Sequence, residues 1–441
     1  MKLLWLSINN YKSLRQIRFL PQQMSVVVGA NASGKTNLAD AFNFLSEVYR
    51  HGLQVAVARK GGYENMAFRR MRRSRGAITF DIGMEIEGED MRFIPADQRW
   101  PRMLFRHRFS IETKGYSIRA DFEVTEELLD VAREQNGVVE SVISIVRDRD
   151  GKIDFRGAPD DQQEKLDLQT SSEKKSRWQR WMDFSDVRYF AERRRNFPPS
   201  ELFLNFIGRY APGLSIFVEA VSGIRVFQIS PTRSREFGVP LPRPEMEVSG
   251  GNLPSVVDML RREYPRQWSS ILSVMRGIIP QLIDITVEYT SMRTLSLGFE
   301  EKGQGRPWGV HEVSDGTMQA LALLVAIFDP RFTFLVLEEP ENSVHPWIIR
   351  RLMAACEDAS KDKQIVITTH SPMVINAASP HSVFVTSRSS NGTRLQRLTE
   401  LDPQFLGAWS EGSVPTFEYL DSGAVPGALP PPSDDGMGAD E

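Results

Sequence analysis

Residues 29 to 36 read Gly-Ala-Asn-Ala-Ser-Gly-Lys-Thr, the pattern of a phosphate-binding loop, and they directly follow the apolar run of residues 24 to 28. In such a loop the glycines let the backbone turn tightly, so that successive N–H groups face the phosphates of a nucleotide. The amphipathic residues 37 to 49 predict a helix whose positive N-terminal end adds to this attraction. Lys35 would supply a point charge, and Thr36 a hydroxyl ligand for Mg²⁺. The sequence therefore predicts a nucleotide-binding protein.

A second motif, Val-Ser-Asp-Gly-Thr-Met-Gln, occupies residues 313 to 319 and runs into a helical pattern over residues 320 to 328. At a helix start, Ser314 and Gly316 would offer a hydroxyl and bare N–H groups to an anion. Ser-Asp-Gly is also the sequence of an ordinary helix N-cap and turn. Both interpretations stay open at this point.

A third motif is the apolar, β-rich run of residues 332 to 337, which ends in the carboxylates Glu338, Glu339 and Glu341. Acids at the C-terminal end of a strand in an open α/β sheet lie in the ligand crevice. One carboxylate can hold Mg²⁺, and its neighbour can orient or deprotonate an attacking water molecule. The alternative is a solvated acidic turn after a core strand.

A fourth motif is the buried-type strand of residues 364 to 369, followed by His370-Ser371-Pro372. A histidine at such a strand end can donate a hydrogen bond to a γ-phosphate and sense its loss. A lone histidine would more often be a bystander. Here the four motifs, each at the end of a strand or the start of a helix, favour one common nucleotide site.

In this order the motifs resemble the Walker A, signature, Walker B and switch-histidine motifs of ABC-type ATPases, in the branch that holds RecF, SMC-like and OLD-like proteins. The more specific marks are Glu-Glu-Pro-Glu-Asn-Ser-Val-His-Pro at residues 338 to 346 and Thr-His-Ser-Pro at residues 369 to 372. They are similar to those of the stand-alone prokaryotic "predicted ATPase" group related to OLD enzymes. The resemblance implies an α/β fold, an ABC-type ATPase head with a mixed central sheet, an antiparallel β lobe and a helical insert.

The resemblance also implies roles for single residues. Glu339 would polarise the attacking water as the catalytic glutamate, and His370 would be the switch histidine. Mg²⁺ would be held by Thr36 and Glu338. The residues that bind the phosphates of ATP would be Gly29, Asn31, Ser33, Gly34, Lys35, Thr36 and Asn37.

In the same family, the signature residues reach the γ-phosphate bound by the other subunit. By the same resemblance, Ser314 and Gly316 would have this role here, and the chain would form a head-to-tail homodimer closed by two ATP molecules.

Two departures from the family pattern bear on the activity. Glu338 stands where the family usually has aspartate, so hydrolysis is expected to be slow, and Val-Ser-Asp-Gly-Thr differs from the transporter signature, which argues against a transporter subunit. Gln54 is one candidate for the glutamine that couples nucleotide to the lobes.

We predict four segments along the chain. Residues 1–122 would form a first ATPase lobe with the phosphate-binding loop and antiparallel strands, and residues 123–275 a mostly helical insert. Residues 276–400 would form a second lobe with the signature, the acids and the histidine. Residues 401–441 would be a C-terminal extension whose Pro-, Gly- and Asp-containing tail is expected to be disordered.

Composition limits the class of protein. The 54 basic and 57 acidic residues give a net charge of −3, and the single cysteine, Cys356, excludes an intramolecular disulfide framework. The start of the chain turns polar too soon for a signal peptide, and no apolar run approaches the ~20 residues of a membrane span. We expect a cytoplasmic protein without membrane contact.

Two partners are open. Arginine-rich stretches at residues 69–75, 99–119, 174–180 and 193–195 can bind DNA phosphates without reading sequence, although such clusters can also be solvated faces paired with acids. OLD-type enzymes continue into a metal-dependent nuclease domain, and residues 371–441 hold no Asp-x-Asp pair, so we expect no intrinsic nuclease. The first hypothesis is a DNA-associated ATPase in recombination, repair or phage defence. The second is an ATP-dependent regulatory scaffold for a separately encoded effector such as a nuclease.

Overall fold

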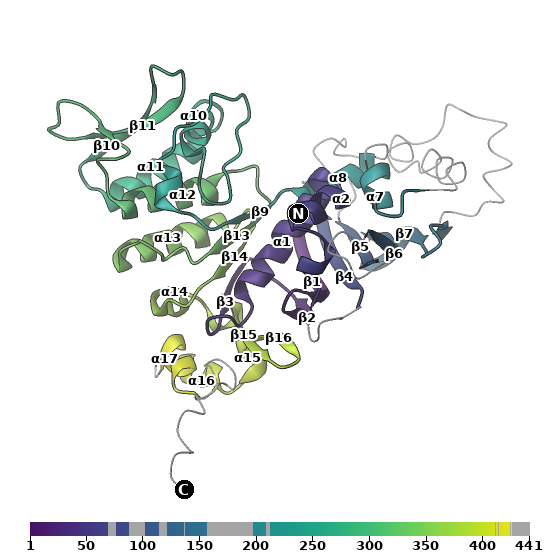
Figure 1. Cartoon of the computed structure of the whole chain (residues 1–441). Coiled ribbons are helices and arrows are strands. Elements are labelled where there is room, and N and C mark those ends of the chain that lie inside the picture. The colour runs from purple at the N-terminus through teal and green to yellow at the C-terminus, as the bar shows by residue number, and fades with distance from the viewer. Residues whose placement is uncertain are drawn as a thin grey trace, which may run out of the picture. The chain divides into compact units, whose positions relative to one another are not determined.

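The computed structural model describes residues 1–68, 76–87, 102–113, 121–135, 137–156, 197–208, 212–410, 412, 414–423 and 425. The chain divides into two compact units (Figure 1). Unit 1 comprises residues 1–21, 40–224 and 390–392, and unit 2 comprises residues 22–39, 225–389 and 393–441. The predicted tail lies almost wholly outside the described residues, as do most of the arginine-rich stretches.

Unit 1 contains a seven-stranded sheet in the order β2-β1-β4-β5-β6-β7-β8, in which every neighbouring pair is antiparallel. Its strands alternate between buried and more exposed residues, as in the β5 sequence RMLFRHRFSIET. This confirms the predicted antiparallel β lobe. The strands are β1 (Lys2–Tyr11), β2 (Leu14–Phe19), β4 (Ile78–Glu87), β5 (Arg102–Thr113), β6 (Phe122–Gln135), β7 (Val138–Arg147) and β8 (Ile153–Arg156).

The prediction of a helical insert is wrong for residues 123–156. These residues form β6, β7 and β8, which extend the antiparallel sheet. The β6 sequence is rich in Glu and contains two Leu, residues that favour helix, but pairing with β5 on one side and β7 on the other outweighs that local preference. Helices do follow later, namely α7 (Phe203–Ile207), α8 (Pro212–Ser222), α9 (Pro231–Ser234), α10 (Leu253–Glu263) and α11 (Pro265–Ile278).

Unit 2 is built on a six-stranded sheet in the order β16-β15-β3-β14-β13-β9. The pairs β13–β14, β14–β3 and β3–β15 are parallel, while β15 and β16 are neighbours joined by a two-residue loop and therefore antiparallel. This confirms the predicted α/β fold with a mixed central sheet. The strands are β3 (Met24–Val28), β9 (Ile224–Phe227), β13 (Phe334–Glu338), β14 (Gln364–Thr368), β15 (Val383–Ser389) and β16 (Gly392–Arg397).

The core of unit 2 packs around α12 (Asp315–Phe328), in which every residue from Thr317 to Ile327 is buried. The strands β13 and β14 are buried along their whole length, as expected for parallel strands covered by helices. A small sheet of β10 (Leu282–Tyr289), β11 (Leu295–Glu301) and β12 (Trp308–Gly309) completes this unit. Further helices are α13 (Pro346–Ala359), α14 (Pro372–Ala377), η3 (Pro380–Ser382), α15 (Leu398–Leu401), α16 (Phe405–Ser410) and α17 (Thr416–Asp421).

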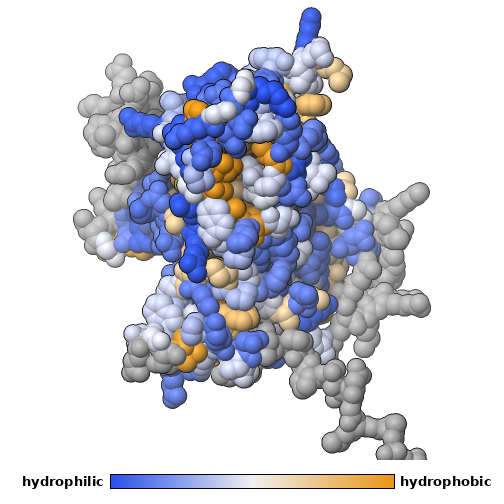
Figure 2. All heavy atoms as spheres, turned by 90° about the vertical axis from the view of Figure 1, so that its left-hand side faces the viewer, coloured by the Kyte–Doolittle hydropathy of each residue, from blue (hydrophilic) through white to orange (hydrophobic). Residues whose placement is uncertain are grey.

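Three helices remain near the N-terminus. The helix α1 (Lys35–His51) begins in unit 2, and its residues from Asp40 onward belong to unit 1, where α2 (Leu53–Arg59) and α3 (Tyr63–Met66) follow. Among the described residues, no helix has the length and apolar character that crossing a membrane requires. On the face shown in Figure 2, hydrophilic residues predominate and hydrophobic ones form small groups between them.

Candidate nucleotide site

The predicted phosphate-binding loop connects β3 to α1 and is held in a tight backbone conformation. Gly29, Ala32 and Gly34 have positive φ angles of 152°, 60° and 115°. A Cβ atom at Gly29 would lie 2.2 Å from the carbonyl oxygen of Thr386, so only glycine fits there. The loop therefore approaches β15 more closely than any side chain would allow.

Lys35 opens α1 and is only 6% exposed. Its Nζ donates hydrogen bonds to the carbonyl oxygens of Gly29 at 2.6 Å and Ala30 at 3.1 Å, so the side chain folds back over the loop. Burial lowers the pKa of Lys35, and the charges of Glu339 and Glu341 partly oppose that shift. The two carboxylates after β13 thus favour the charged form of Lys35.

The other predicted phosphate ligands surround the start of α1. Asn31 and Thr36 are exposed, and Asn37 is half-buried. The first N–H groups of a helix have no intrahelical carbonyl to bond, so they are available to an anion together with the positive end of the helix dipole. Thr36, the second residue of α1, is exposed at this end.

Ser33 has a different environment from the rest of the loop. Its hydroxyl is buried and lies 2.7 Å from the Thr386 hydroxyl, which also donates to the Val28 carbonyl at 2.9 Å. Its carbonyl accepts a 2.8 Å hydrogen bond from the hydroxyl of Thr393. The β15–β16 hairpin therefore fixes the shape of the loop, and the Ser33 side chain serves that attachment.

The acidic turn, residues 338–343, follows β13. Glu338 ends the strand, is 9% exposed and pairs in register with Thr368 of β14. Glu339 has a φ of 43°, a left-handed conformation that non-glycine residues rarely adopt and that is concentrated at functional sites. Its N–H donates to the Thr368 carbonyl at 2.8 Å, and its Oε2 accepts a 3.1 Å hydrogen bond from Asn342.

The switch segment, residues 369–371, follows β14 and contacts the acidic turn. His370 is 54% exposed, and its Nδ1 lies 3.6 Å from Glu339 Oε1 and 3.7 Å from Glu341 Oε1. Glu341 Oε1 also accepts hydrogen bonds from the Thr369 hydroxyl at 2.5 Å and the His370 N–H at 3.2 Å. The structure thus brings together the predicted catalytic glutamate and the predicted switch histidine.

The signature residues lie at the start of α12. Ser314 is the N-cap, and its Oγ accepts a 3.2 Å hydrogen bond from the Thr317 N–H. A Cβ at Gly316 would lie 3.2 Å from the Ser343 carbonyl, which places the helix start beside the acidic turn. Within the described part of the chain, no hydrogen bond or ion pair joins Ser314 or Gly316 to Lys35.

The donors present fit a magnesium ion. Thr36 and Glu338 supply a hydroxyl and a carboxylate oxygen, the hard ligands that Mg²⁺ prefers. Among the described residues there is no group of three or more His, Cys, Asp or Glu side chains that could hold a metal ion. Phosphate and water oxygens would therefore complete the coordination, as is usual when Mg²⁺ accompanies a nucleotide.

Sequence reasoning did not assign roles to Glu341, Thr386 and Thr393. The third carboxylate of the acidic run was a visible signal for Glu341, whereas nothing near Thr386 or Thr393 in the sequence marks them as neighbours of the loop. Tyr11, which the resemblance names together with Lys12 as a neighbour of the adenine, ends β1. Its side chain is fully buried and donates a 2.6 Å hydrogen bond to Asp40, so its ring is not accessible to a base. Gln54 donates to Ser200 within unit 1.

Comparison with known proteins gives one family and several solved structures. Residues 24–376 match the family described as "AAA domain, putative AbiEii toxin, Type IV TA system". No curated protein matches. Among solved structures, an SMC head bound to the C-winged helix domain of ScpA is 13% identical with a TM-score of 0.48, covering 90% of this chain and 98% of its own. An SMC head domain from Thermotoga maritima is 14% identical with a TM-score of 0.38, covering 90% and 99%. An Smc head from Pyrococcus furiosus, with an extended coiled coil and bound to the C-terminal domain of ScpA, is 12% identical with a TM-score of 0.46, covering 92% and 99%.

Proposed function

We propose, from the premise that the chain belongs to this AAA-domain family, that it is a Mg²⁺-dependent ATPase whose heads close in pairs around ATP. One observation carries the proposal. The acidic turn and the switch segment meet, with His370 Nδ1 3.6 Å from Glu339 Oε1, and the charge of Glu339 also acts on Lys35. In this proposal Lys35 is the cation for the phosphates, Glu339 the base for water and His370 the hydrogen-bond donor for the γ-phosphate of one site.

Each residue has a step in this proposal. Lys35 and the first N–H groups of α1 hold the phosphates of ATP. Thr36 and Glu338 would hold Mg²⁺, which would supply positive charge to the phosphates. Glu339 orients the attacking water and accepts its proton. His370 donates a hydrogen bond to the γ-phosphate until it leaves. The long Glu338 side chain, in place of the usual aspartate, is consistent with slow turnover.

Pairing of heads rests on the signature residues. Ser314 is exposed and Gly316 is half-buried at the start of α12, where Ser314 caps the helix and Gly316 lies beside the Ser343 carbonyl. A second copy would present the same residues to the γ-phosphate bound at Lys35. ATP then favours the closed pair through contacts that exist only in that state.

We propose two candidate targets for this ATPase. The first is duplex DNA, through the arginine-rich stretches, most of which lie outside the described residues. The second is a separate effector protein, such as a nuclease, which the nucleotide state would regulate. The described arginines of β5 favour the second, because Arg102, Arg106 and Arg108 all pair with acidic residues, at 2.6, 2.7 and 3.5 Å.

Steady-state ATP turnover tests the proposal, with the wild type compared with Glu339→Gln. Because a general base contributes about 10²–10⁴-fold, we expect turnover to fall by that factor in the variant, which should accumulate as an ATP-bound dimer by light scattering. Wild-type turnover in the Glu339→Gln protein would show that the assignment of Glu339 is wrong.

The same assay distinguishes the two targets. Linear duplex DNA is added at low salt, and the salt concentration is then raised. Stimulation that fades with salt would support phosphate contacts and the DNA-associated role. Turnover that is indifferent to DNA at every salt concentration would support regulation of a protein effector instead.

A further inference from the structure

Glu341 is a buried carboxylate with no role in the proposed mechanism. It lies in the acidic turn, and its side chain is 8% exposed. One oxygen, Oε1, accepts two hydrogen bonds from the switch segment, from the Thr369 hydroxyl at 2.5 Å and from the His370 N–H at 3.2 Å. The other oxygen, Oε2, is buried and has no hydrogen-bond partner among the described residues.

We propose that Glu341 is a positioning residue, which anchors the switch segment to the acidic turn and thereby sets the distance between His370 and Glu339. The proposal rests on the ATPase function and adds to it a residue that acts through His370. In this role the Glu341 carboxylate acts as a hydrogen-bond acceptor. Its negative charge binds neither a metal ion nor a substrate.

The environment of His370 explains why an anchor is needed. Its imidazole is 54% exposed, so packing does not fix the ring. The backbone that carries it is held instead, because the Thr369 N–H donates to the Val27 carbonyl at 3.1 Å and the Thr369 hydroxyl accepts from the Ser371 N–H at 2.9 Å. Glu341 adds the bond that ties this segment to the turn bearing Glu339.

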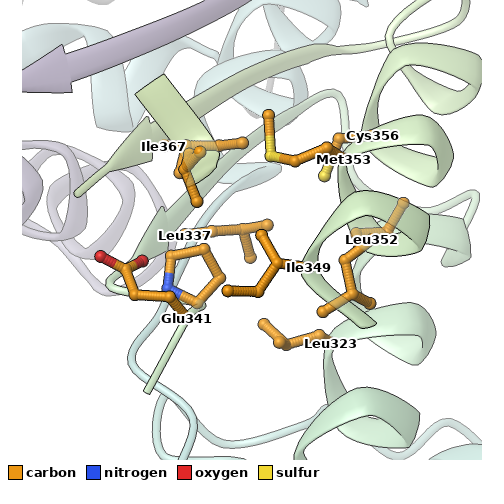
Figure 3. Close-up of a pocket in the computed structure, with 11 residues that line it drawn as sticks. Leu323, Leu337, Glu341, Ile349, Leu352, Met353, Cys356 and Ile367 are labelled. Atoms are coloured by element: carbon orange, nitrogen blue, oxygen red, sulfur yellow. The ribbon is translucent and has the colours of Figure 1, made fainter. Parts of the chain in front are cut away.

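The direction of the Glu341 side chain agrees with this role. Below the turn, an apolar cavity is lined by residues of β13, β14, α12 and α13, including Leu323, Ile349 and Leu352. Figure 3 shows the carboxylate of Glu341 pointing away from those side chains. A carboxylate with one unpartnered buried oxygen is costly, and a core of this kind would accept an apolar residue more readily. Its presence is therefore explained by the two bonds that Oε1 makes.

Two substitutions of Glu341 distinguish the effect of its hydrogen-bond acceptor from the effect of its negative charge. Glu341→Gln keeps a carbonyl oxygen in the place of Oε1 and removes the charge, whereas Glu341→Ala removes both. Thr369→Val removes the hydroxyl that donates to Oε1 while keeping the side-chain shape. His370→Ala is the reference for loss of the histidine itself.

The experiment measures kcat and KM for ATP in the wild type, in these four variants and in one double variant. We expect kcat to fall about tenfold in Glu341→Ala, as two hydrogen bonds are lost, with KM changed less than about twofold. Glu341→Gln should stay within about threefold of the wild type, and Thr369→Val should lie between the two. The double variant Glu341→Ala/Thr369→Val should be no slower than Glu341→Ala alone, because both remove the same bond.

Three results would overturn the inference or its premise. Wild-type kcat in Glu341→Ala, alongside a reduced kcat in His370→Ala, would refute the positioning role and leave the ATPase function intact. A Glu341→Gln protein as slow as Glu341→Ala would show that the charge acts rather than the acceptor. Wild-type kcat in His370→Ala would refute the role of the histidine in the proposed function itself. If Glu341→Ala does not fold, Thr369→Val and Glu341→Gln test the same bond.

Discussion

Two buried glutamates, one in each unit, have opposite environments. Glu127 lies on β6 in the antiparallel sheet of unit 1, and both of its oxygens are bonded. Oε2 accepts from the Phe203 N–H at 2.7 Å, while Oε1 accepts from the Leu204 N–H at 2.8 Å and lies 3.2 Å from His107. In unit 2, Glu341 has one oxygen bonded twice and the other not at all.

The difference separates two uses of a buried polar group. The partners of Glu127 are the N-terminal amides of α7, a histidine bonded to Tyr49 and, at 3.7 Å, Arg147, so the group is a cross-link within a core. The partners of Glu341 belong to the switch segment beside exposed catalytic candidates. Glu127 thus joins elements within the core of unit 1, whereas Glu341 joins two turns at strand ends through one oxygen alone.

The largest expected effect is on unfolding. Glu127→Ala leaves two amides without their acceptor and the buried Arg147 without its carboxylate neighbour, so the free energy of unfolding should fall by about 3–5 kcal/mol. Glu341→Ala should cost only about 1–2 kcal/mol, although it lowers kcat. Urea denaturation followed by circular dichroism measures both, with the exposed Glu140→Ala as a control expected within about 0.5 kcal/mol. Equal losses for Glu127 and Glu341 would remove the distinction.

A buried lysine, Lys363, extends the comparison to cations. Burial lowers the pKa of Lys363 from 10.5 to about 8, and its Nζ donates to the carbonyl of Asp329 at the end of α12. The unfolded chain therefore binds more protons than the folded one between pH 8 and 10.5, and stability rises with pH across that window. Relative to Lys363→Met, the wild type should gain up to about 3 kcal/mol between these pH values. A stability difference that is flat from pH 7 to 10.5 would contradict the shift.

Two hydroxyl pairs test whether the loop attachment matters for binding. Thr386 pairs with Ser33 at 2.7 Å in unit 2, and Thr79 pairs with Ser110 at 2.8 Å in unit 1, all of them buried. In a Glu339→Gln background, Thr386→Val should weaken ATP binding by about fivefold, equivalent to about 1 kcal/mol. Thr79→Val should cost similar stability and leave affinity unchanged. Titration calorimetry measures the ATP affinity of both variants. Equal affinities for Thr386→Val and Thr79→Val would show that the hairpin does not shape the loop.

The smallest effect concerns the two interpretations of Ser314. As the N-cap of α12, its loss in Ser314→Ala should lower the free energy of unfolding by about 1 kcal/mol. If Ser314 also acts as a signature residue, ATP turnover should fall further than this loss of stability explains, at a temperature where the variant remains folded. Unchanged turnover would leave Ser314 as a helix cap alone.

The sequence predicted the elements whose signals are local. Apolar runs and cap residues identified β3, β13, β14, α1 and α12, and membership in this ATPase group is confirmed by the match over residues 24–376. Strands β6 to β8 were missed because their side-chain composition favours helix and only pairing with neighbours decides otherwise.

The site shows the same limit. The motifs predicted the phosphate-binding loop, the acids and the histidine at strand ends, and the histidine lies near Glu339 and Glu341. The hydrogen bond between Ser33 and Thr386 joins residues 353 positions apart, and no periodicity or motif in the sequence indicates such a pair. The bonding of Glu341 could not be predicted either, because it depends on how two turns are folded.

The hairpin of β15 and β16 has a consequence for anyone who shortens this protein. All the recognisable motifs end before residue 376, where the family match also ends, yet β15 is the parallel neighbour of β3. A fragment trimmed to the motifs would turn the strand that carries the phosphate-binding loop into an open edge, with unpaired N–H and C=O groups that can recruit other chains. Such a fragment would retain every residue expected to touch ATP and would nevertheless be prone to aggregate. A useful truncation must therefore retain residues up to at least 397.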